Sequence, residues 1–227
     1  MAGAGTTTPR ERYRAQVRAE VKERAWEQIA TAGASALSLN AIAKHMGMTG
    51  PALYRYFAGR DELITELVRD AYRSLADGVG EARAAGADAA GLAHALREWA
   101  LADPQRYFLV YGTPVPGYHA PDDITAIAAE IMGHLLDALN SPEASEASTA
   151  PVPPPAARLD DHLADHRDWA GDHPAPPAVL HRALSFWTRL HGILSLELAG
   201  HFTGMGFDPA LFYEAELADL SGRSGPV

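Results

Sequence analysis

Hydrogen-bond donors suited to phosphate are concentrated in one short stretch of the sequence. Tyr54 and Tyr56 carry hydroxyl groups on long side chains, and Arg55 and Arg60 add two positive charges. Groups of this kind commonly donate hydrogen bonds to the phosphate oxygens of nucleic acids. We therefore expect this stretch to bind a polyanion.

A glycine-containing turn between two short helices is expected to position these donors. Ser38 caps a predicted helix over 39–46, and Gly47 ends it with a positive φ. Thr49 caps the next helix, whose first turn contains Pro51 and which is predicted to run through Phe57. The pattern is typical of a helix-turn-helix, in which the second helix enters the major groove of DNA. The alternative is a plain three-helix packing unit with solvated charges, because short helices joined by glycine occur in many proteins.

The residues expected to contact DNA fall into two groups. Small residues at the start of the second helix let its backbone approach base edges, whereas the polar residues around it suit phosphates. The full set is Ser38, Thr49, Gly50, Pro51, Ala52, Tyr54, Arg55, Tyr56 and Arg60. Four further arginines precede or begin the first helix and could reach the minor groove or the DNA backbone: Arg10, Arg12, Arg14 and Arg18.

The distribution of charge supports a nucleic-acid partner, although the net charge of −10 does not. Residues 1–60 have a net charge of +5, whereas residues 61–227 have −15. A basic head on an acidic body suits a protein that presents only its head to a polyanion, with chance clustering as the alternative.

Composition excludes several classes of protein. The chain has 227 residues, 47% of them apolar, and no cysteine, which excludes a disulfide scaffold and thiolate metal sites. No charge-free apolar run approaches the length of a membrane span, and the N-terminus lacks the apolar core of a signal peptide. We expect a soluble, cytoplasmic protein.

Apolar residues recur every three or four positions throughout, and strand signals are almost absent, so the predicted fold class is all-α. The predicted domains are a three-helix DNA-binding domain over 1–60 and a larger helical ligand-binding and dimerisation domain over 61–227. Residues 141–177 hold eight of the sixteen prolines and are predicted to form a mobile linker with at most a short helix near 159–169. Beyond the first 60 residues, helices are predicted near 60–75, 88–102, 104–112, 121–140, 177–200 and 208–220.

The stretch "LSLNAIAKHMGMTGPALYRYFAGRDEL" resembles the signature of the tetracycline-repressor (TetR) family of bacterial transcription regulators. The matching positions are Gly33, Ser38, Ile42, Ala43, Gly47, Thr49, Leu53, Tyr54, Tyr56, Phe57, Arg60 and Leu63. The resemblance implies that Ser38, Tyr54, Tyr56 and Arg60 hold phosphates and that residues 49–52 face bases. The family usually has His where Tyr56 stands and Ser-Lys where Gly59 and Arg60 stand. Gly50 has no side chain to contact a base, so the base sequence at this position must be recognised by neighbouring residues or through DNA shape.

The second half resembles the C-terminal domain of one branch of this family. The stretches "DPQRYFLVYGTPVPGY" and "FWTRLHGILSLELAGHF" carry the likeness, with a Trp187, His191 and Gly192 element. The resemblance implies a domain that dimerises and binds a small molecule.

The predicted helix over 177–200 independently suggests a dimer. Apolar residues on it follow a spacing of 4, 3, 4, 3, 4, as in a coiled-coil seam. The residues expected at the dimer interface are Leu180, Leu184, Leu194 and Leu198. A central core helix in a monomer is the alternative.

Aromatic residues of the second half are expected to enclose an apolar ligand pocket, with an ordinary aromatic core as the alternative. The residues are Trp99, Tyr107, Phe108, Tyr111, Phe186, Trp187 and His191. His162 and His166 are spaced as metal ligands can be, but their proline-rich setting favours a solvated acidic linker, so no metal or cofactor is expected.

These observations together predict a ligand-responsive repressor that binds double-stranded DNA as a homodimer and is released by a small apolar effector. One alternative is a small helical enzyme acting on an apolar molecule. However, the sequence contains no HExxH, no G-x-S-x-G and no phosphate-binding glycine loop after a strand. The other alternative is a non-catalytic dimeric helical scaffold.

Overall fold

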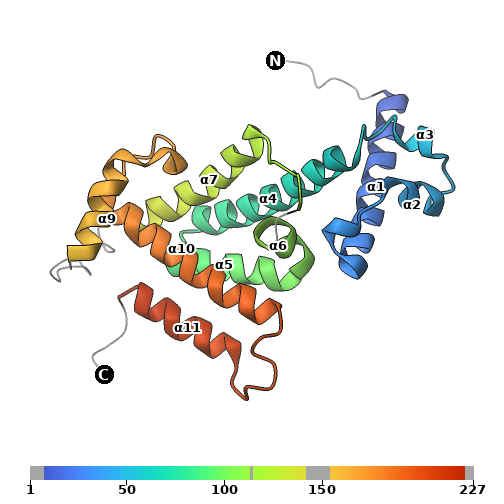
Figure 1. Cartoon of the computed structure of the whole chain (residues 1–227). Helices are drawn as coiled ribbons and strands as arrows, with labels where there is room; N and C mark the ends of the chain where they lie inside the picture. Colours follow the sequence, from blue (N-terminus) through green and yellow to red (C-terminus); the bar gives the residue numbers. More distant parts are fainter. Residues whose placement is uncertain (1–7, 113–114, 142–153, 223–227) are drawn as a thin grey trace. The chain divides into compact units, whose positions relative to one another are not determined.

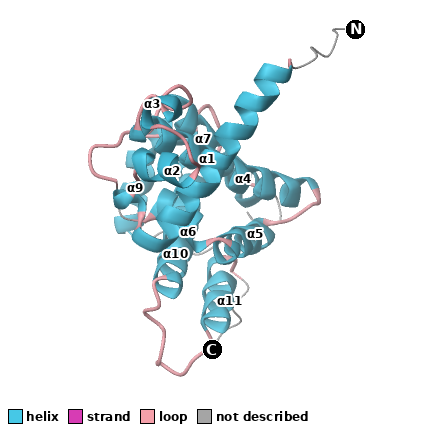
Figure 2. Cartoon of the chain, turned by 90° about the vertical axis from the view of Figure 1, so that its right-hand side faces the viewer, coloured by secondary structure: helices cyan, strands magenta, loops and turns pink. Residues whose placement is uncertain are grey.

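The structure is a computed structural model that describes residues 8–112, 115–141 and 154–222. Within these ranges every regular element is helical, which confirms the predicted all-α class (Figure 2). The α-helices, labelled in Figure 1, are α1 (Pro9–Ala32), α2 (Leu39–His45), α3 (Gly50–Leu53), α4 (Arg60–Ala84), α5 (Ala89–Ala102), α6 (Pro104–Tyr111), α7 (Asp122–Leu139), α9 (Pro154–Asp165), α10 (Pro177–Leu198) and α11 (Pro209–Leu220). Two 3₁₀ helices are η1 (Ala34–Ala36) and η2 (Asp168–Ala170).

The chain forms two compact units. Residues 1–71 and 105–121 form the first, here called the recognition unit, and residues 72–104 and 122–227 form the second, the body unit. The predicted boundary after residue 60 lies at the start of α4, whereas the division between the units falls within α4. The stretch 105–121, which contains most of α6, joins the recognition unit although it is distant in sequence.

The recognition unit has a small apolar core built from short elements. Val21 and Ala25 of α1, Ile42 of α2, and Leu53 and Phe57 around α3 have no exposed surface. From α6, the guanidinium of Arg106 lies 5.8 Å from the ring centroid of Trp26 of α1. Side chains of α1 and α2 therefore form one core with those around α3, and α6 contacts this core through α1.

The body unit is arranged around α10, which packs against α5, α7, α9 and α11 (Figure 1). Leu180, Ala183, Leu190 and Leu194 on α10 have no exposed surface. The hydroxyl of Tyr213 on α11 donates a hydrogen bond of 2.8 Å to the carbonyl of Ala93 on α5.

The predicted linker over 141–177 is in part helical. Residues 142–153 lie outside the described residues, but α9 covers Pro154–Asp165 and packs against α10. Asp160 of α9 pairs with His181 of α10 at 2.8 Å. The prediction treated the prolines as helix breakers and missed the start of α9, which begins at Pro154. Proline is tolerated at the first position of a helix.

No helix in the described part of the chain is both long enough and apolar enough to cross a bilayer.

Candidate functional site

Gly47 makes the turn between α2 and α3. Its φ is +65°, a value that favours glycine. The Gly47 amide donates to the Lys44 carbonyl at 3.3 Å, and the Met48 amide donates to the Ala43 carbonyl at 2.8 Å. This double hydrogen bond is a Schellman motif, and it ends α2 where the sequence predicts.

The recognition helix α3 is shorter than predicted, because it ends at Leu53 and a turn carries the chain through Tyr54–Tyr56. A four-residue helix has no stability of its own. Leu53 and Phe57 anchor it, since both are fully buried. A Cβ atom placed on Gly50 would lie 3.3 Å from Oδ1 of Asn40 on α2, so glycine there allows the two helices to approach closely.

Most of the residues expected to contact DNA have surface available. Four of them are exposed: Thr49, Pro51, Tyr54 and Arg55. The exposed fraction of Tyr54 is 47%. The partly exposed members of the set are Gly50, Ala52 and Tyr56. Their contacts with DNA stay predictions, and the structure leaves the residues open to a partner.

Ser38 caps α2 as predicted. Its hydroxyl accepts a hydrogen bond of 3.4 Å from the amide of Ala41, and its own amide donates to Oε1 of Gln28 on α1 at 3.0 Å. The side chain of Gln28 therefore fixes the start of α2, a role that the sequence pattern did not suggest. Half-buried Ser38 retains the surface for its predicted phosphate contact.

Arg60 is directed partly into its own chain. Its Nη2 donates to the carbonyls of Ala34 at 3.0 Å and Ser35 at 3.4 Å, and its side chain is 30% exposed. The guanidinium thus holds η1 against the start of α4. The phosphate contact of Arg60 stays a prediction, and the same side chain also has this structural role.

Two of the arginines on α1 also face the protein. Nη2 of Arg14 donates to the carbonyl of Arg55 at 3.3 Å, and Nη1 of Arg18 donates to the carbonyl of Tyr56. The expected DNA contact of Arg18 stays a prediction, and in this structure its guanidinium binds the turn after α3. Arg10 and Arg12 remain exposed.

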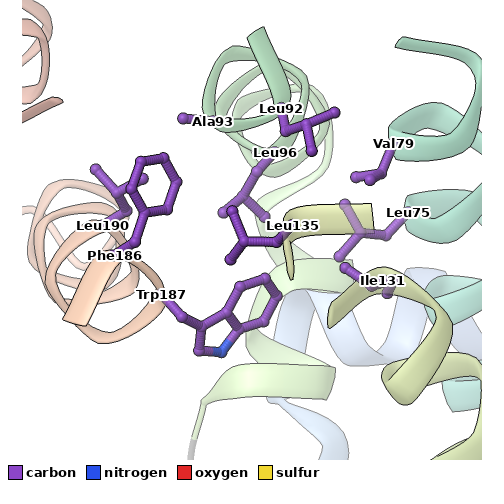
Figure 3. A pocket seen from close by; sticks show the side chains of 10 residues that line it. All are labelled: Leu75, Val79, Leu92, Ala93, Leu96, Ile131, Leu135, Phe186, Trp187 and Leu190. Atoms are coloured by element: carbon purple, nitrogen blue, oxygen red, sulfur yellow. The ribbon is translucent and has the colours of Figure 1, made fainter. Parts of the chain in front are cut away.

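The body unit contains a small, partly open apolar cavity of about 20 Å³. Side chains from α4, α5, α7 and α10 converge on it (Figure 3). They are Leu75, Val79, Leu92, Ala93, Leu96, Ile131, Leu135, Phe186, Trp187 and Leu190. A space of this size holds about one water molecule, so any larger ligand requires the helices to move apart.

Only part of the predicted aromatic set lines this cavity. Phe186 and Trp187 do, whereas Trp99 donates its Nε1 hydrogen to the hydroxyl of Ser74 at 2.9 Å. The three aromatic residues of α6 belong to the recognition unit, where the ring of Tyr107 lies 5.7 Å from that of Phe108 and 5.4 Å from that of Tyr111. Aliphatic residues that the sequence reasoning passed over supply most of the lining.

His191 lies beside the cavity, with its ring centroid 4.2 Å from that of Trp187. Burial lowers the pKa of His191 from 6.5 to about 4, because the charged imidazolium loses its hydration. The side chain is therefore neutral at physiological pH, which suits an apolar surrounding.

The predicted dimer seam is divided between two environments. Leu180 and Leu194 are fully covered by their own chain and have no surface to offer a partner. Leu184 and Leu198 are partly exposed. The same heptad-like spacing is expected for a helix that packs into the core of its own chain. Leu180 and Leu194, half of the predicted seam, are buried in this way.

His162 of α9 and His166, directly after this helix, stack on each other with ring centroids 3.9 Å apart. In the described part of the chain, no three His, Asp or Glu side chains are grouped to hold a metal ion.

Comparison with known proteins identifies the family. Residues 23–67 match the family described as "Bacterial regulatory proteins, tetR family", and residues 89–220 match the "Tetracyclin repressor-like, C-terminal domain". The second match alone spans more than half of the chain. The protein belongs to the TetR family of bacterial transcription regulators, as the motif resemblance predicts.

Relatives and solved structures support this assignment. The HTH-type transcriptional regulators Mb1846 of Mycobacterium bovis and Rv1816 of Mycobacterium tuberculosis are each 36% identical over 214 residues, covering 89% of this chain and 90% of the relative. The crystal structure of SCO4313 is 70% identical, with a TM-score of 0.83 and coverage of 94% of this chain and 98% of that chain. A protein of unknown function from Rhodococcus sp. RHA1 shares the fold at 21% identity, with a TM-score of 0.63 and coverage of 90% and 93%.

The chain is therefore a DNA-binding transcriptional regulator with a helix-turn-helix, and not an enzyme. The exposed residues from Thr49 to Arg55 lie within the matched helix-turn-helix segment.

Proposed function

We propose that the protein is a homodimeric, cytoplasmic repressor that binds a palindromic operator and is released by a small neutral apolar effector. The observation that carries this proposal is the presence of an exposed recognition segment in one unit and of a small apolar cavity in the other. Each half of the palindrome binds one recognition helix. The distance between the two half-sites is about 34–36 Å, or another distance that the shape of the dimer imposes.

The proposed dimer surface is the α10–α11 face, which we define by the exposed apolar residues Leu196, Ala199, Leu211 and Phe212. Leu196 is 45% exposed and Leu211 is 69% exposed. Large apolar side chains on neighbouring helices favour burial against a partner, and a second copy of the same surface is the most economical one. Partly exposed Leu184 and Leu198 can extend it.

Two substitutions test this dimer surface, one inside it and one outside it as a control. Leu211→Glu should shift the mass in solution from dimer to monomer and abolish tight operator binding. Leu159→Glu, which changes an exposed leucine of α9, should leave the dimer intact. Dimers of unchanged stability for Leu211→Glu would contradict this surface.

The effector class is proposed from the cavity lining. All ten side chains around it are hydrocarbon or aromatic, and His191 beside it is neutral, so a charged ligand would lose its hydration without compensation. Leu75 and Val79 of the lining lie on α4, the helix that also contributes Leu63 and Leu67 to the recognition unit. A ligand that expands the cavity and displaces α4 shifts the population away from the DNA-binding form.

The DNA-binding part of the proposal is tested by selecting duplexes from a random pool and titrating salt. Arg55→Met should weaken binding to selected and unrelated duplexes alike. It should also reduce the slope of log K against log salt by about 0.9 for each phosphate group that the protein no longer neutralises. An unchanged slope would contradict a phosphate contact by Arg55.

The effector part needs a separate readout. Decanol should release the selected duplex more effectively than decanoate, and Ala93→Val, whose two added methyl groups occupy the cavity, should reduce this response while DNA binding persists. Equal release by the alcohol and the carboxylate would contradict the apolar effector class.

A further inference from the structure

The turn after α3 exposes carbonyl groups that no helix satisfies, and side chains of α1 bind them. Nη1 of Arg18 donates to the carbonyl of Tyr56, and Nη2 of Arg14 donates to the carbonyl of Arg55 at 3.3 Å. Hydrogen bonds from a charged donor are about twice as strong as neutral ones. The turn that carries Tyr54 and Arg55 is thus held from the side of α1.

The guanidinium of Arg18 also packs on a core aromatic ring. Its Cζ lies 4.1 Å from the ring centroid of Phe57, which has no exposed surface, and the Arg18 side chain is only 23% exposed. This contact over the ring restricts the guanidinium, so its donor atoms are positioned before any DNA arrives.

Two carboxylates of α4 complete the arrangement. Nη1 of Arg18 lies 3.5 Å from Oε1 of Glu62, and Nη2 lies 3.4 Å from Oε2 of Glu66. Oε2 of Glu62 accepts a hydrogen bond of 2.5 Å from the amide of Ala58. Arg18 therefore connects α1, the turn over 55–58 and the first turns of α4 through one side chain.

We propose that Arg18 is a positioning residue for DNA recognition, which holds the turn over 55–58 in its DNA-binding conformation and makes no phosphate contact itself. The short helix α3 cannot hold its own geometry, so the exposed residues around it depend on the turn that follows. Without Arg18 the turn samples other conformations. Binding to DNA must then order the turn, and the loss of conformational entropy reduces the affinity. The proposal depends on DNA binding alone and not on the dimer or the effector.

The test compares Arg18→Met with Arg24→Met on the duplex that the wild-type protein selects from a random pool and on an unrelated duplex. Both changes remove one positive charge from α1, but Arg24 pairs only with Glu27, at 2.8 Å, among the contacts that the structure describes for it. Arg18→Met should bind the selected duplex about ten- to a hundredfold more weakly, the range expected when a charged hydrogen bond is removed. Its salt slope should equal that of Arg24→Met, and its preference for the selected duplex should fall.

Two results would overturn the proposal. One is binding by Arg18→Met equal to that of Arg24→Met. The other is an equal loss on both duplexes with a salt slope lower by about 0.9 per subunit than that of Arg24→Met, which is the signature of a phosphate contact.

A conservative variant keeps the test valid if Arg18→Met does not fold. Lysine retains a charge for Glu62 and Glu66 but lacks the planar group that stacks on Phe57 and donates to the Tyr56 carbonyl. Arg18→Lys should show an intermediate loss of affinity and faster amide hydrogen exchange over 54–58, with unchanged exchange in α10. Wild-type affinity and exchange in Arg18→Lys would refute the positioning role.

Discussion

Arg18 in the recognition unit and Arg97 in the body unit are both mostly buried, but they bind different acceptors. Arg18 donates to a backbone carbonyl and lies near two carboxylates. Arg97 donates to the single carboxylate of Glu197 at 2.6 Å, and its Cζ lies 5.4 Å from the ring centroid of Tyr213. The backbone of long helices satisfies itself, so Arg97, which lies between helices, can bind a side chain, whereas an irregular turn needs side-chain donors for its own carbonyls.

The two units also differ in how their helices are maintained. The recognition unit relies on caps, a positive-φ glycine and polar contacts to loops. The body unit also has helix caps and positive-φ glycines, but its helices are arranged by apolar packing around α10, and Tyr213 and Arg97 each join one helix to another. Substitutions in the body should therefore act through burial, and those in the recognition unit through local backbone geometry.

The largest effect is expected at the ion pair of the body unit. Arg97 and Glu197 side chains are 16% and 14% exposed, so removing one partner leaves a buried charge. Arg97→Met should lower the free energy of unfolding by about 3–5 kcal/mol, whereas Arg97→Met with Glu197→Leu should recover most of it. Chemical denaturation measures both, and a double variant as unstable as the single one would contradict this account.

The next effect concerns pH. The folded-state pKa of His191 is about 4, below its ordinary 6.5, so the unfolded state binds more protons between these values. Stability should fall as pH is lowered from about 6.5 to about 4, by about 3 kcal/mol from this group. His191→Phe should lack this part of the pH dependence. Parallel stability curves for the two proteins would show that His191 is not protected from protonation.

A smaller effect, of opposite sign in the two units, is expected from replacing glycine by alanine. Gly47→Ala should destabilise by about 1 kcal/mol, because φ is +65° and a Cβ atom there meets no other atom within 4 Å, so the cost is torsional. Gly78→Ala, inside α4 with open space around it, should stabilise by about 0.5–1 kcal/mol. Thermal unfolding compares them, with Gly47→Asn as an intermediate control. A change in stability of the same sign for Gly47→Ala and Gly78→Ala would contradict this distinction between the units.

The smallest effect is expected at the surface of the body unit. Arg73 makes two hydrogen bonds to Glu130, of 2.8 and 2.7 Å, and holds the pKa of that carboxyl below its ordinary value. The side chains are 40% and 43% exposed, so a double-mutant cycle should give a coupling of no more than about 1 kcal/mol, reduced at high salt. A larger, salt-independent coupling would mean that surface pairs also hold the body together.

Short-range signals in the sequence identified the helices and their ends. Ser38 and Gly47 act through neighbours three or four residues away, so their cap roles could be predicted from residue type and position. The predicted α10 was equally clear as a long apolar helix, but the periodicity did not say which of its sides the chain covers. The complete burial of Leu180 and Leu194 depends on helices distant in sequence.

The sequence by itself determined the all-helical class, the helix-turn-helix and the family, because these depend on local backbone preferences and on a motif of a dozen positions. Only the tertiary structure decided that Arg18 and Arg60 face backbone carbonyls and that aliphatic residues line the cavity. A long charged side chain can point to solvent, to DNA or to its own chain with little difference in local energy. Its direction is chosen by acceptors that folding brings near it from other parts of the chain.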